Sequence, residues 1–221
     1  MVSRESPRAR RKPPGERRAE ITAAAAAVAL SAGLERVTLR VVAGELDVRP
    51  GLIHHYFPAA DDLVAAAFAL AVSGERRRIL TADGSPLRRL AHLASSVQDE
   101  RGHELARLWL NARHLARFNA SLAEALEEQE ALDRDQLTQL IEDGVRDGTF
   151  HTDDPFAACV RIFVAIDGFG AYANNTQPFM HLSFTNFVTD VAEWSLGLDA
   201  GSLRAALEGG AEPPGAVHDR T

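Results

Sequence analysis

Two prolines eight residues apart, Pro50 and Pro58, place the tightest constraint on how this chain can fold. Pro50 suits the first turn of a helix, where its missing N–H is not needed. Pro58 disfavours helical backbone at the residue before it, so that helix ends at or before Phe57. Asp47 tolerates left-handed turn geometry better than most residues other than glycine. The segment therefore predicts a short helix over 50–57 that follows a tight turn.

Two further helices are predicted before this turn. An Ala-rich run over 17–32 has no helix breaker, and Gly33 can end it with a positive φ. Thr38 can cap a short helix over 39–46, because its hydroxyl accepts a backbone N–H. A long helix followed by two short ones across a tight turn is a helix-turn-helix.

The remainder of the chain also predicts helices. No segment alternates polar and apolar residues over a sustained stretch, as a half-buried strand would, so we expect an all-α fold. Helix starts and stops, such as Asn119 and Gly148, divide the remainder into segments. The expected helices cover about 60–80, 86–99, 102–117, 120–147, 154–173 and 182–197.

Charge is distributed unevenly along the sequence. The net charge is −7, but residues 1–60 carry ten Arg and Lys against six Asp and Glu, which is +4 and leaves −11 for the rest. A positive segment on a negative body indicates where a polyanion docks, although a basic tail that only aids solubility has the same composition. The single cysteine, Cys159, fits a reducing compartment, and no uncharged apolar run reaches membrane-spanning length. We therefore expect a cytoplasmic protein with no membrane partner.

The short helix contains an unusual cluster, His54-His55-Tyr56, that fits three kinds of site. A metal site is disfavoured, because adjacent helical residues point about 100° apart and ligand pairs favour i, i+4 spacing. A catalytic site is disfavoured too, since no carboxylate or nucleophile lies nearby in register. A nucleic-acid contact surface remains, because His and Tyr give directional hydrogen bonds to phosphates and base edges. No metal or other cofactor is predicted.

The span from Arg17 to Phe68 resembles the DNA-binding domain of the tetracycline-repressor-like (TetR/AcrR) transcriptional regulators. The resemblance rests on AGLERVTLR, VVAGELDVRPG and GLIHHYFPAADDL. Further along, GVRDGTF and AIDGFG look like the C-terminal half of choline-sensing members. The resemblance implies a ligand-responsive regulator, most often a repressor, that binds a palindromic operator in double-stranded DNA as a homodimer.

The resemblance also implies roles for individual residues. Val48, Ile53 and Phe57 anchor the third helix to its own domain. Phosphates or bases are contacted by Thr38, Arg40, Arg49, Pro50, Gly51, Leu52, His54, His55 and Tyr56. The implied division is a disordered basic arm over 1–16, a helix-turn-helix domain over 17–62, an effector-binding and dimerisation domain over 63–198, and a tail over 199–221.

Three positions depart from the family pattern. Members commonly have Tyr where this chain has His54, Lys where it has Ala60, and Gly where it has Asp47. The lysine often touches phosphate, so its absence should weaken non-specific affinity. We expect the basic arm at 8–12 to compensate, by reaching a minor groove.

In this family the last two long helices pair with those of a second copy. An apolar face wide enough to need two partners favours a homodimer here, although the same residues could close the core of one chain. The expected interface residues are Phe156, Val160, Phe163, Phe184, Phe187, Val188, Val191 and Trp194.

The small-molecule effector, whose identity the sequence does not give, needs an apolar chamber with a few polar groups. Asp167 interrupts an apolar stretch and requires a partner, which could be a cationic ligand, His114, Arg113 or another internal partner. The expected lining residues are Trp109, Asn111, His114, Phe118, Phe163, Asp167, Phe169 and Tyr172. Gly168 and Gly170 could instead allow helices to pack closely.

Two other functions were considered. An enzyme could use His114, His151, Asp167 or Cys159, but no phosphate loop, metal motif or nucleophile elbow accompanies them. A helical scaffold without DNA binding is disfavoured by the charge distribution and by the 50–57 helix. We therefore expect a regulator that is not an enzyme.

Overall fold

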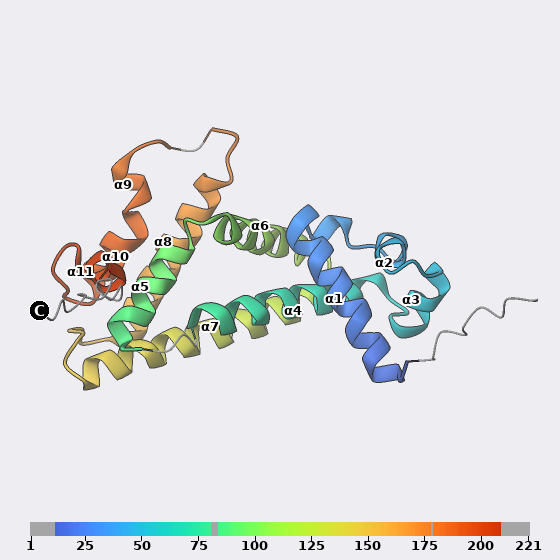
Figure 1. The fold of residues 1–221 in the computed structure, drawn as a ribbon, viewed down its shortest axis with the longest axis horizontal. Helices are drawn as coiled ribbons and strands as arrows, with labels where there is room; N and C mark the ends of the chain where they lie inside the picture. The colour runs from blue at the N-terminus through green and yellow to red at the C-terminus, as the bar shows by residue number, and fades with distance from the viewer. Residues whose placement is uncertain (1–11, 81–83, 178, 209–221) are drawn as a thin grey trace, which may run out of the picture.

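The computed structural model describes residues 12–80, 84–177 and 179–208, and every regular element within them is a helix (Figure 1). The predicted all-α class is therefore confirmed. In chain order the elements are α1 (Pro14–Ala32), the 3-10 turn η1 (Leu34–Arg36), α2 (Leu39–Glu45), α3 (Pro50–Tyr56), α4 (Ala60–Leu80), α5 (Pro86–Ser96), α6 (Glu100–Leu115), α7 (Ala120–Arg146), α8 (Pro155–Ala173), α9 (Leu182–Thr185), α10 (Phe187–Ser195) and α11 (Ser202–Glu208).

The predicted helix signals act where they were expected in the N-terminal part. Gly33 ends α1 with φ 97°. The Thr38 hydroxyl accepts a hydrogen bond of 3.2 Å from the N–H of Val41, which caps α2. Asp47 has φ 51°, and Pro50 is the first residue of α3. Helices α1 to α3 thus form the predicted helix-turn-helix.

The core of this N-terminal part continues into the body without a gap. Ile21, Ile53 and Phe68, from α1, α3 and α4, are fully buried in one cluster. The same cluster includes Leu108 of α6 and Leu122 of α7. The helix-turn-helix is therefore packed onto the body and is not tethered by a flexible linker.

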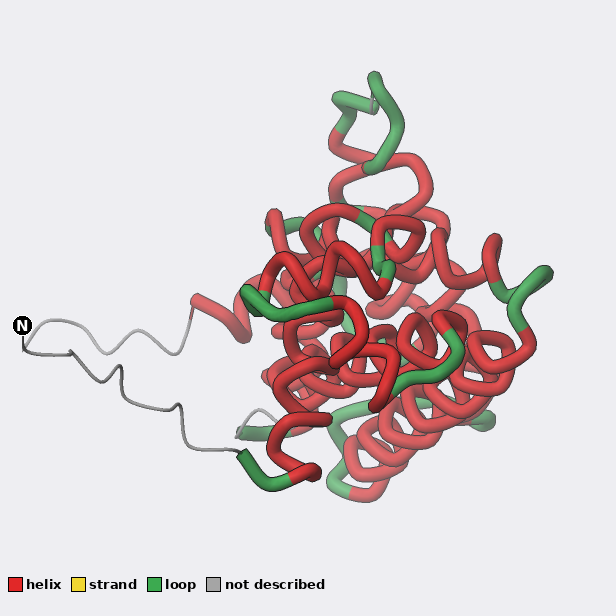
Figure 2. The backbone as a smooth tube through the Cα atoms, turned by 90° about the vertical axis from the view of Figure 1, so that its right-hand side faces the viewer, coloured by secondary structure: helices red, strands yellow, loops and turns green. Residues whose placement is uncertain are grey.

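Helix α4 runs from the helix-turn-helix into the body, where it packs along α7 (Figure 1). A second core joins α5, α7, α8, α10 and α11 at the far end. Figure 2, turned by 90°, shows helices packed on one another with loops at their ends. Helix α8 is long and apolar enough to cross a membrane by length and composition alone, a property that core helices of soluble proteins share.

The last predicted helix, 182–197, is wrong as a single element. It is divided at Asn186 into α9 and α10. The ring of Phe184 stacks on Phe169 of α8, with centroids 4.7 Å apart and an angle of 16° between the planes. This contact packs α9 against α8, and α9 is a helix separate from α10.

The expected division also differs at both termini. Helix α1 begins at Pro14, inside the arm expected over 1–16, whereas residues 1–11 lie outside the described part. Helix α11 lies inside the expected tail, because Glu193 accepts hydrogen bonds of 2.9 Å from the N–H groups of Gly201 and Leu203. Leu203 is buried in the second core, so this segment is part of the fold.

Candidate functional site

Helix α3 has one face in the protein core and the other in solvent. Ile53 and Phe57 are 0% and 1% exposed, and Val48 packs partly against the same cluster. The anchoring predicted for these residues is therefore confirmed. On the outward side, Arg49, Pro50, Gly51, His54 and His55 are exposed, while Leu52 and Tyr56 are half-buried.

Gly51 stands at the most open position of this helix. A Cβ atom built there would meet nothing within 4 Å. The φ angle of Gly51 is not positive, so its backbone conformation is open to other residues as well. The fold of the described chain therefore does not require glycine at this position.

Helix α1 holds the C-terminal end of α3. The Arg18 guanidinium donates a hydrogen bond of 2.6 Å to the carbonyl oxygen of Tyr56 and lies 4.1 Å from the centroid of the Phe57 ring. The rings of His55 and Tyr56 meet edge to face, 5.1 Å apart. From the sequence alone, Arg18 was only one of several basic residues. Its i, i+3 spacing to the buried Ile21 was the available sign that it lies on the side of α1 that meets α3.

The start of α2 lies beside α3 and carries two predicted contacts. Thr38 is exposed and uses its oxygen as a cap acceptor, which leaves its O–H free to donate to a phosphate. Arg40 is also exposed. Ala60, the position where family members often have lysine, is exposed at the start of α4 and supplies no charge. Compensation by the arm stays a prediction; Lys12, its one described residue, pairs with Glu20 at 2.8 Å.

A cavity of about 340 Å³ lies in the body between α4, α5, α6, α7 and α8. Of the predicted lining residues, Trp109, Phe163, Asp167 and Phe169 line it. Four others do not line it, and for them ligand contact stays a prediction: Asn111, His114, Phe118 and Tyr172. Helix α6 presents Leu105, Ala106, Trp109, Leu110 and Arg113 to the cavity, so residues 111 and 114 fall on other faces of that helix.

Asp167 has a protein partner at the edge of this cavity. Arg113 forms two contacts with its carboxylate, of 3.1 Å from Nη1 to Oδ1 and 2.9 Å from Nη2 to Oδ2. Desolvation by burial raises the pKa of the Asp167 carboxyl group, and the Arg113 guanidinium offsets this only in part. The Asp167 side chain is nevertheless 45% exposed. Of the possible partners of Asp167, the structure thus has Arg113, with which it forms an internal ion pair.

The most buried charged group of the cavity, Arg76, was not predicted from the sequence. Its side chain is 6% exposed; it pairs through Nε with Asp133 and donates through Nη2 to the backbone oxygen (3.1 Å) and Oε1 (2.8 Å) of Gln129. Burial raises the pKa of Asp133 despite the guanidinium beside it. Arg76 lies four residues after Val72 and three before Ile79 on an apolar stripe, which was the available signal.

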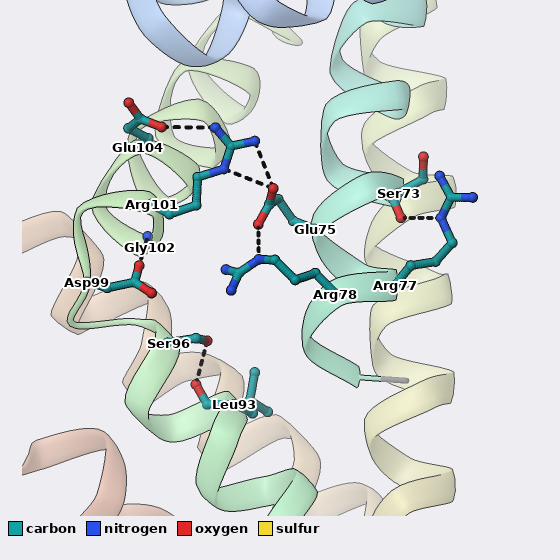
Figure 3. Close-up of polar contacts among 10 residues, drawn as sticks. All are labelled: Ser73, Glu75, Arg77, Arg78, Leu93, Ser96, Asp99, Arg101, Gly102 and Glu104. Atoms are coloured by element: carbon teal, nitrogen blue, oxygen red, sulfur yellow. Dashed lines mark hydrogen bonds and ion pairs between the residues drawn. The ribbon is translucent and has the colours of Figure 1, made fainter. Parts of the chain in front are cut away.

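The neighbouring residue, Glu75, does not line the cavity and joins α4 to α6 (Figure 3). Its carboxylate accepts hydrogen bonds of 2.9 Å from Nε of Arg101 and 2.8 Å from Nε of Arg78. Burial alone raises the pKa of Glu75, but the two arginines outweigh it and hold that pKa below its ordinary value. Successive residues of α4 therefore fix this helix to two different neighbours, α6 and α7.

Residues 21–67 match a protein-family model described as "Bacterial regulatory proteins, tetR family". This span begins in α1 and ends in α4, so it contains the whole α2–α3 surface described above. The chain is a TetR-family transcriptional regulator. TetR-family proteins are DNA-binding regulators and not enzymes. No curated protein sequence matches the chain.

Solved structures share the fold of this TetR-family regulator over most of its length. A TetR-family regulator from Cytophaga hutchinsonii is 17% identical, with TM-score 0.71 over 87% of this chain and 99% of that one. One from Rhodococcus sp. is 19% identical, with TM-score 0.69 over 82% and 99%. A transcriptional regulator from Saccharomonospora viridis, solved in complex with choline, is 18% identical, with TM-score 0.66 over 82% and 98%.

The regulator exposes an apolar face on α8 and α10 that only partly matches the predicted dimer interface. Phe156, Val160, Phe187 and Trp194 are exposed, at 55%, 39%, 45% and 72%. Val188, however, is 1% exposed, so its inclusion is corrected: it belongs to the core of the chain itself. Phe163, Phe184 and Val191 also pack partly against that core.

Helix α8 adds residues to this face that were not predicted as interface. Val164 is 65% exposed, and Arg161 lies 5.7 Å from the centroid of the Trp194 ring. A Cβ atom at Gly168 would meet nothing within 4 Å, whereas one at Gly170 would lie 2.7 Å from Cβ of Ala106. Close helix packing is therefore confirmed for Gly170, against α6, but Gly168 has no such neighbour in the described part of the chain.

Cys159 is a remaining candidate for a reactive group. Cys159 is buried, as predicted; burial raises the pKa of its thiol, which donates to the carbonyl oxygen of Arg134 at 3.6 Å. Within the described residues, no three His, Cys, Asp or Glu side chains are grouped as metal ligands would be.

Proposed function

We propose that this regulator is a repressor that binds a palindromic operator as a homodimer and leaves it when a small molecule occupies the body cavity. The observation that carries the proposal is α3, which is anchored through Ile53 and Phe57 and presents an exposed side with an open glycine. A recognition helix lies in the major groove with its N-terminal residues against base edges. In this chain those residues are Arg49, Pro50 and Gly51.

Each side chain of this surface has a role that its chemistry supports. Arg49 suits guanine edges, and the two histidines suit phosphates or purine edges. Leu52 supplies apolar contact to a thymine methyl group. Tyr56, half-buried and held in place through its own carbonyl group, directs its phenol to a phosphate. Thr38 and Arg40 contact the backbone from the start of α2.

A homodimer supplies a second copy of α3 as the second recognition helix. Two helices must lie roughly 34–36 Å apart to enter successive major grooves, which one copy of α3 cannot achieve. The exposed face of α8 and α10, defined by Phe156, Val160, Val164, Phe187 and Trp194, is the surface that favours self-association. The open Gly168 on α8 permits close approach of a second helix there.

The cavity is the proposed effector site. It lies beside α4, and the first residues of α4 follow α3 directly. A ligand can therefore alter the distance between the two α3 helices of a dimer. The S. viridis structure with choline is a case in which the same fold holds a small molecule. A coupling of about 3 kcal/mol would change operator affinity about 150-fold.

In this proposal residues 17–62 bind DNA, and residues 63–198 bind the effector and the second copy of the chain. The protein acts in the cytoplasm.

The test is selection of duplexes from a random pool, followed by binding measurements over a salt series. The proposal expects a near-palindromic site. A His55→Ala, Tyr56→Phe double variant should lose affinity for that site while it stays folded. The matched control changes the same residue types elsewhere, in a His114→Ala, Tyr172→Phe variant, and should bind like the parent. Enrichment of no sequence, or equal binding by all three proteins, would refute the recognition surface.

A further inference from the structure

The charged groups that line the cavity balance one another in number. Three are cationic and three anionic: Arg76, Arg113, Arg134, Glu130, Asp133 and Asp167. Every carboxylate among them has an arginine partner. Asp133 pairs with Arg76, and Asp167 pairs with Arg113. Glu130 pairs with Arg113 at 3.2 Å and with Arg134 at 3.7 Å.

This pairing disfavours a ligand that carries a net charge. A cation would have to take a carboxylate from an arginine, and an anion would have to take an arginine from a carboxylate. The exchange is most costly at Arg76 and Asp133, which are 6% and 18% exposed, because it leaves a buried charge without its partner. The carboxylate that suggested a cationic ligand from the sequence, Asp167, already accepts from two nitrogens of Arg113.

One donor of a largely buried side chain nevertheless remains for a ligand. Arg76 lines the cavity and is 6% exposed; it uses Nε and Nη2 on Asp133 and Gln129, and no hydrogen bond within the described residues engages Nη1. The Ser96 hydroxyl, by contrast, donates to the carbonyl oxygen of Leu93 at 2.9 Å. A hydrogen bond to a charged donor in a partly desolvated cavity is stronger than one in water, so a ligand that supplies an oxygen gains from it.

The other walls are apolar and aromatic. Trp109 and Phe163 face the space, together with aliphatic side chains such as Val72, Ile79 and Leu105. Apolar walls with one or two fixed polar groups bind molecules of matching pattern. A volume of about 340 Å³ accommodates a small molecule.

We infer that the ligand of this cavity is an uncharged, largely apolar molecule that offers one hydrogen-bond acceptor, such as a ketone, ester or amide oxygen, to Arg76. This inference rests on the proposed function only in naming that ligand as the effector. The ligand stacks its apolar part between the aromatic walls and directs its oxygen toward the Arg76–Asp133 pair. The four ion pairs of the cavity stay intact in the complex.

The test compares four probes with similar skeletons and different head groups. They are 4-phenylbutan-2-one (neutral, with an acceptor), butylbenzene (neutral, without one), 4-phenylbutanoate (anion) and trimethyl(3-phenylpropyl)ammonium (cation). Binding to the full chain is measured by calorimetry and by the change in Tm. The ketone should bind about tenfold tighter than each of the other three, the gain from one hydrogen bond to a charged donor.

Two arginine variants identify the group responsible. Arg76→Lys keeps the positive charge beside Asp133 but removes the guanidinium, so the advantage of the ketone over butylbenzene should disappear. Arg101→Lys is the control, because Arg101 also pairs with a buried carboxylate, Glu75, but does not line the cavity. In that variant the ketone should keep its advantage. If Arg76→Lys does not fold, the ranking of the four probes on the parent protein still decides.

The outcomes separate the ligand class from the proposed function. Tightest binding by the ammonium or carboxylate probe, or binding of none of the four, overturns the inference. Operator binding by the same protein in either case leaves the recognition surface intact. Ketone binding with the expected ranking but no effect on operator affinity supports the ligand class and refutes its role as effector.

Discussion

The rings of Phe68 and Trp109 meet edge to face, with centroids 5.1 Å apart and planes at 88°. Phe68 is fully buried in the core that also holds α1 and α3, whereas Trp109 lines the cavity. A ligand that touches Trp109 is therefore one side chain away from the core of the helix-turn-helix. Aromatic pairs of this kind contribute about 0.5–1.5 kcal/mol beyond their buried area, and they depend on ring orientation.

Replacing Phe68 with Leu should weaken communication between cavity and DNA. The variant removes the aromatic contact but keeps an apolar side chain, at a cost of about 1 kcal/mol in stability. Operator affinity without ligand should stay near that of the parent, while the loss of affinity caused by 4-phenylbutan-2-one should shrink. Phe169→Leu is the control, because Phe169 lines the cavity but packs on Phe184 in the other core. Equal shrinkage in both variants would remove the special role of Phe68.

Removing Arg18 should disturb α3 from the side that meets α1. Arg18→Met loses the hydrogen bond to the Tyr56 carbonyl oxygen and the contact with Phe57, together worth about 1 kcal/mol, or about fivefold in affinity. Arg17→Met loses the same charge one residue away, but Arg17 pairs only with Glu20 in the described structure. Operator titrations should show the greater loss for Arg18→Met. Identical losses would mean that only the charge matters.

Gly51→Ala should affect stability and DNA binding in opposite directions. The position is open, so alanine should raise helix stability by up to about 1 kcal/mol. A methyl group between α3 and the duplex should lower operator affinity about tenfold or more, or about 1.4 kcal/mol. Gly74→Ala on α4 is equally open and should give a similar gain without the loss. Thermal unfolding and operator titration of both variants check this, and undiminished binding by Gly51→Ala would place the helix away from the groove.

A charged side chain on the exposed face of α8 should dissociate the proposed homodimer. Val164→Arg introduces a cation at a residue that is 65% exposed in the single chain, so folding should survive while a dimer dissociates. Sedimentation and circular dichroism measure the two properties. Leu132→Arg places the same charge at a 40% exposed residue of α7 and should leave the assembly unchanged. A Val164→Arg protein that still sediments as the parent does would exclude this face.

The ion pair between Glu75 and Arg101 predicts a pH dependence. Because folding lowers the pKa of Glu75, its carboxylate stabilises the fold above the unfolded-state pKa, and this contribution is lost as pH falls through the folded-state value. Glu75→Gln should therefore reduce the free energy of unfolding at pH 7 by about 1–3 kcal/mol, and the difference from the parent should fade between roughly pH 5 and pH 3. Asp133, whose pKa is raised, contributes with the opposite sign, so only the comparison with the parent isolates Glu75.

Glu104→Gln is the matched control for that measurement. Glu104 contacts the same arginine at 3.2 Å but is more exposed, so its loss should cost no more than about 0.5 kcal/mol at any pH. Denaturant titrations of the three proteins across this pH range provide the values. A constant difference between Glu75→Gln and the parent down to pH 3 would contradict the lowered pKa.

The N-terminal half of the fold was predictable because local signals decide it. Asp47 and Pro50 act through their own backbone preferences, and Thr38 caps a helix only three residues away. The buried side of α3 followed from its apolar residues. Each of these signals acts within one or two turns of chain, where sequence spacing and spatial distance are nearly the same.

Features fixed by distant contacts were not predictable in this way. Next to the break at Asn186, the ring of Phe184 stacks on Phe169 of α8, and α11 is capped by Glu193 of α10, so both features involve contacts with another helix. Residues 111 and 114 were assigned to the cavity by residue type, without regard to the face of α6 on which they lie. Arg76 was missed because a charged residue in an apolar stripe is recognisable as buried only when its partners on α7 are known.

Helix α4 contains the point, between residues 62 and 63, at which the sequence suggested that one domain ends and the next begins. A protease that cleaves exposed connections therefore finds no substrate at that point, and limited digestion should not release the DNA reader as a separate fragment. Chimeras between relatives meet the same obstacle. A cut between residues 62 and 63 leaves Phe68 with Trp109 but separates Phe68 from Ile21 and Ile53, with which it shares a core, so working hybrids must take α1, α3 and this part of α4 from one parent.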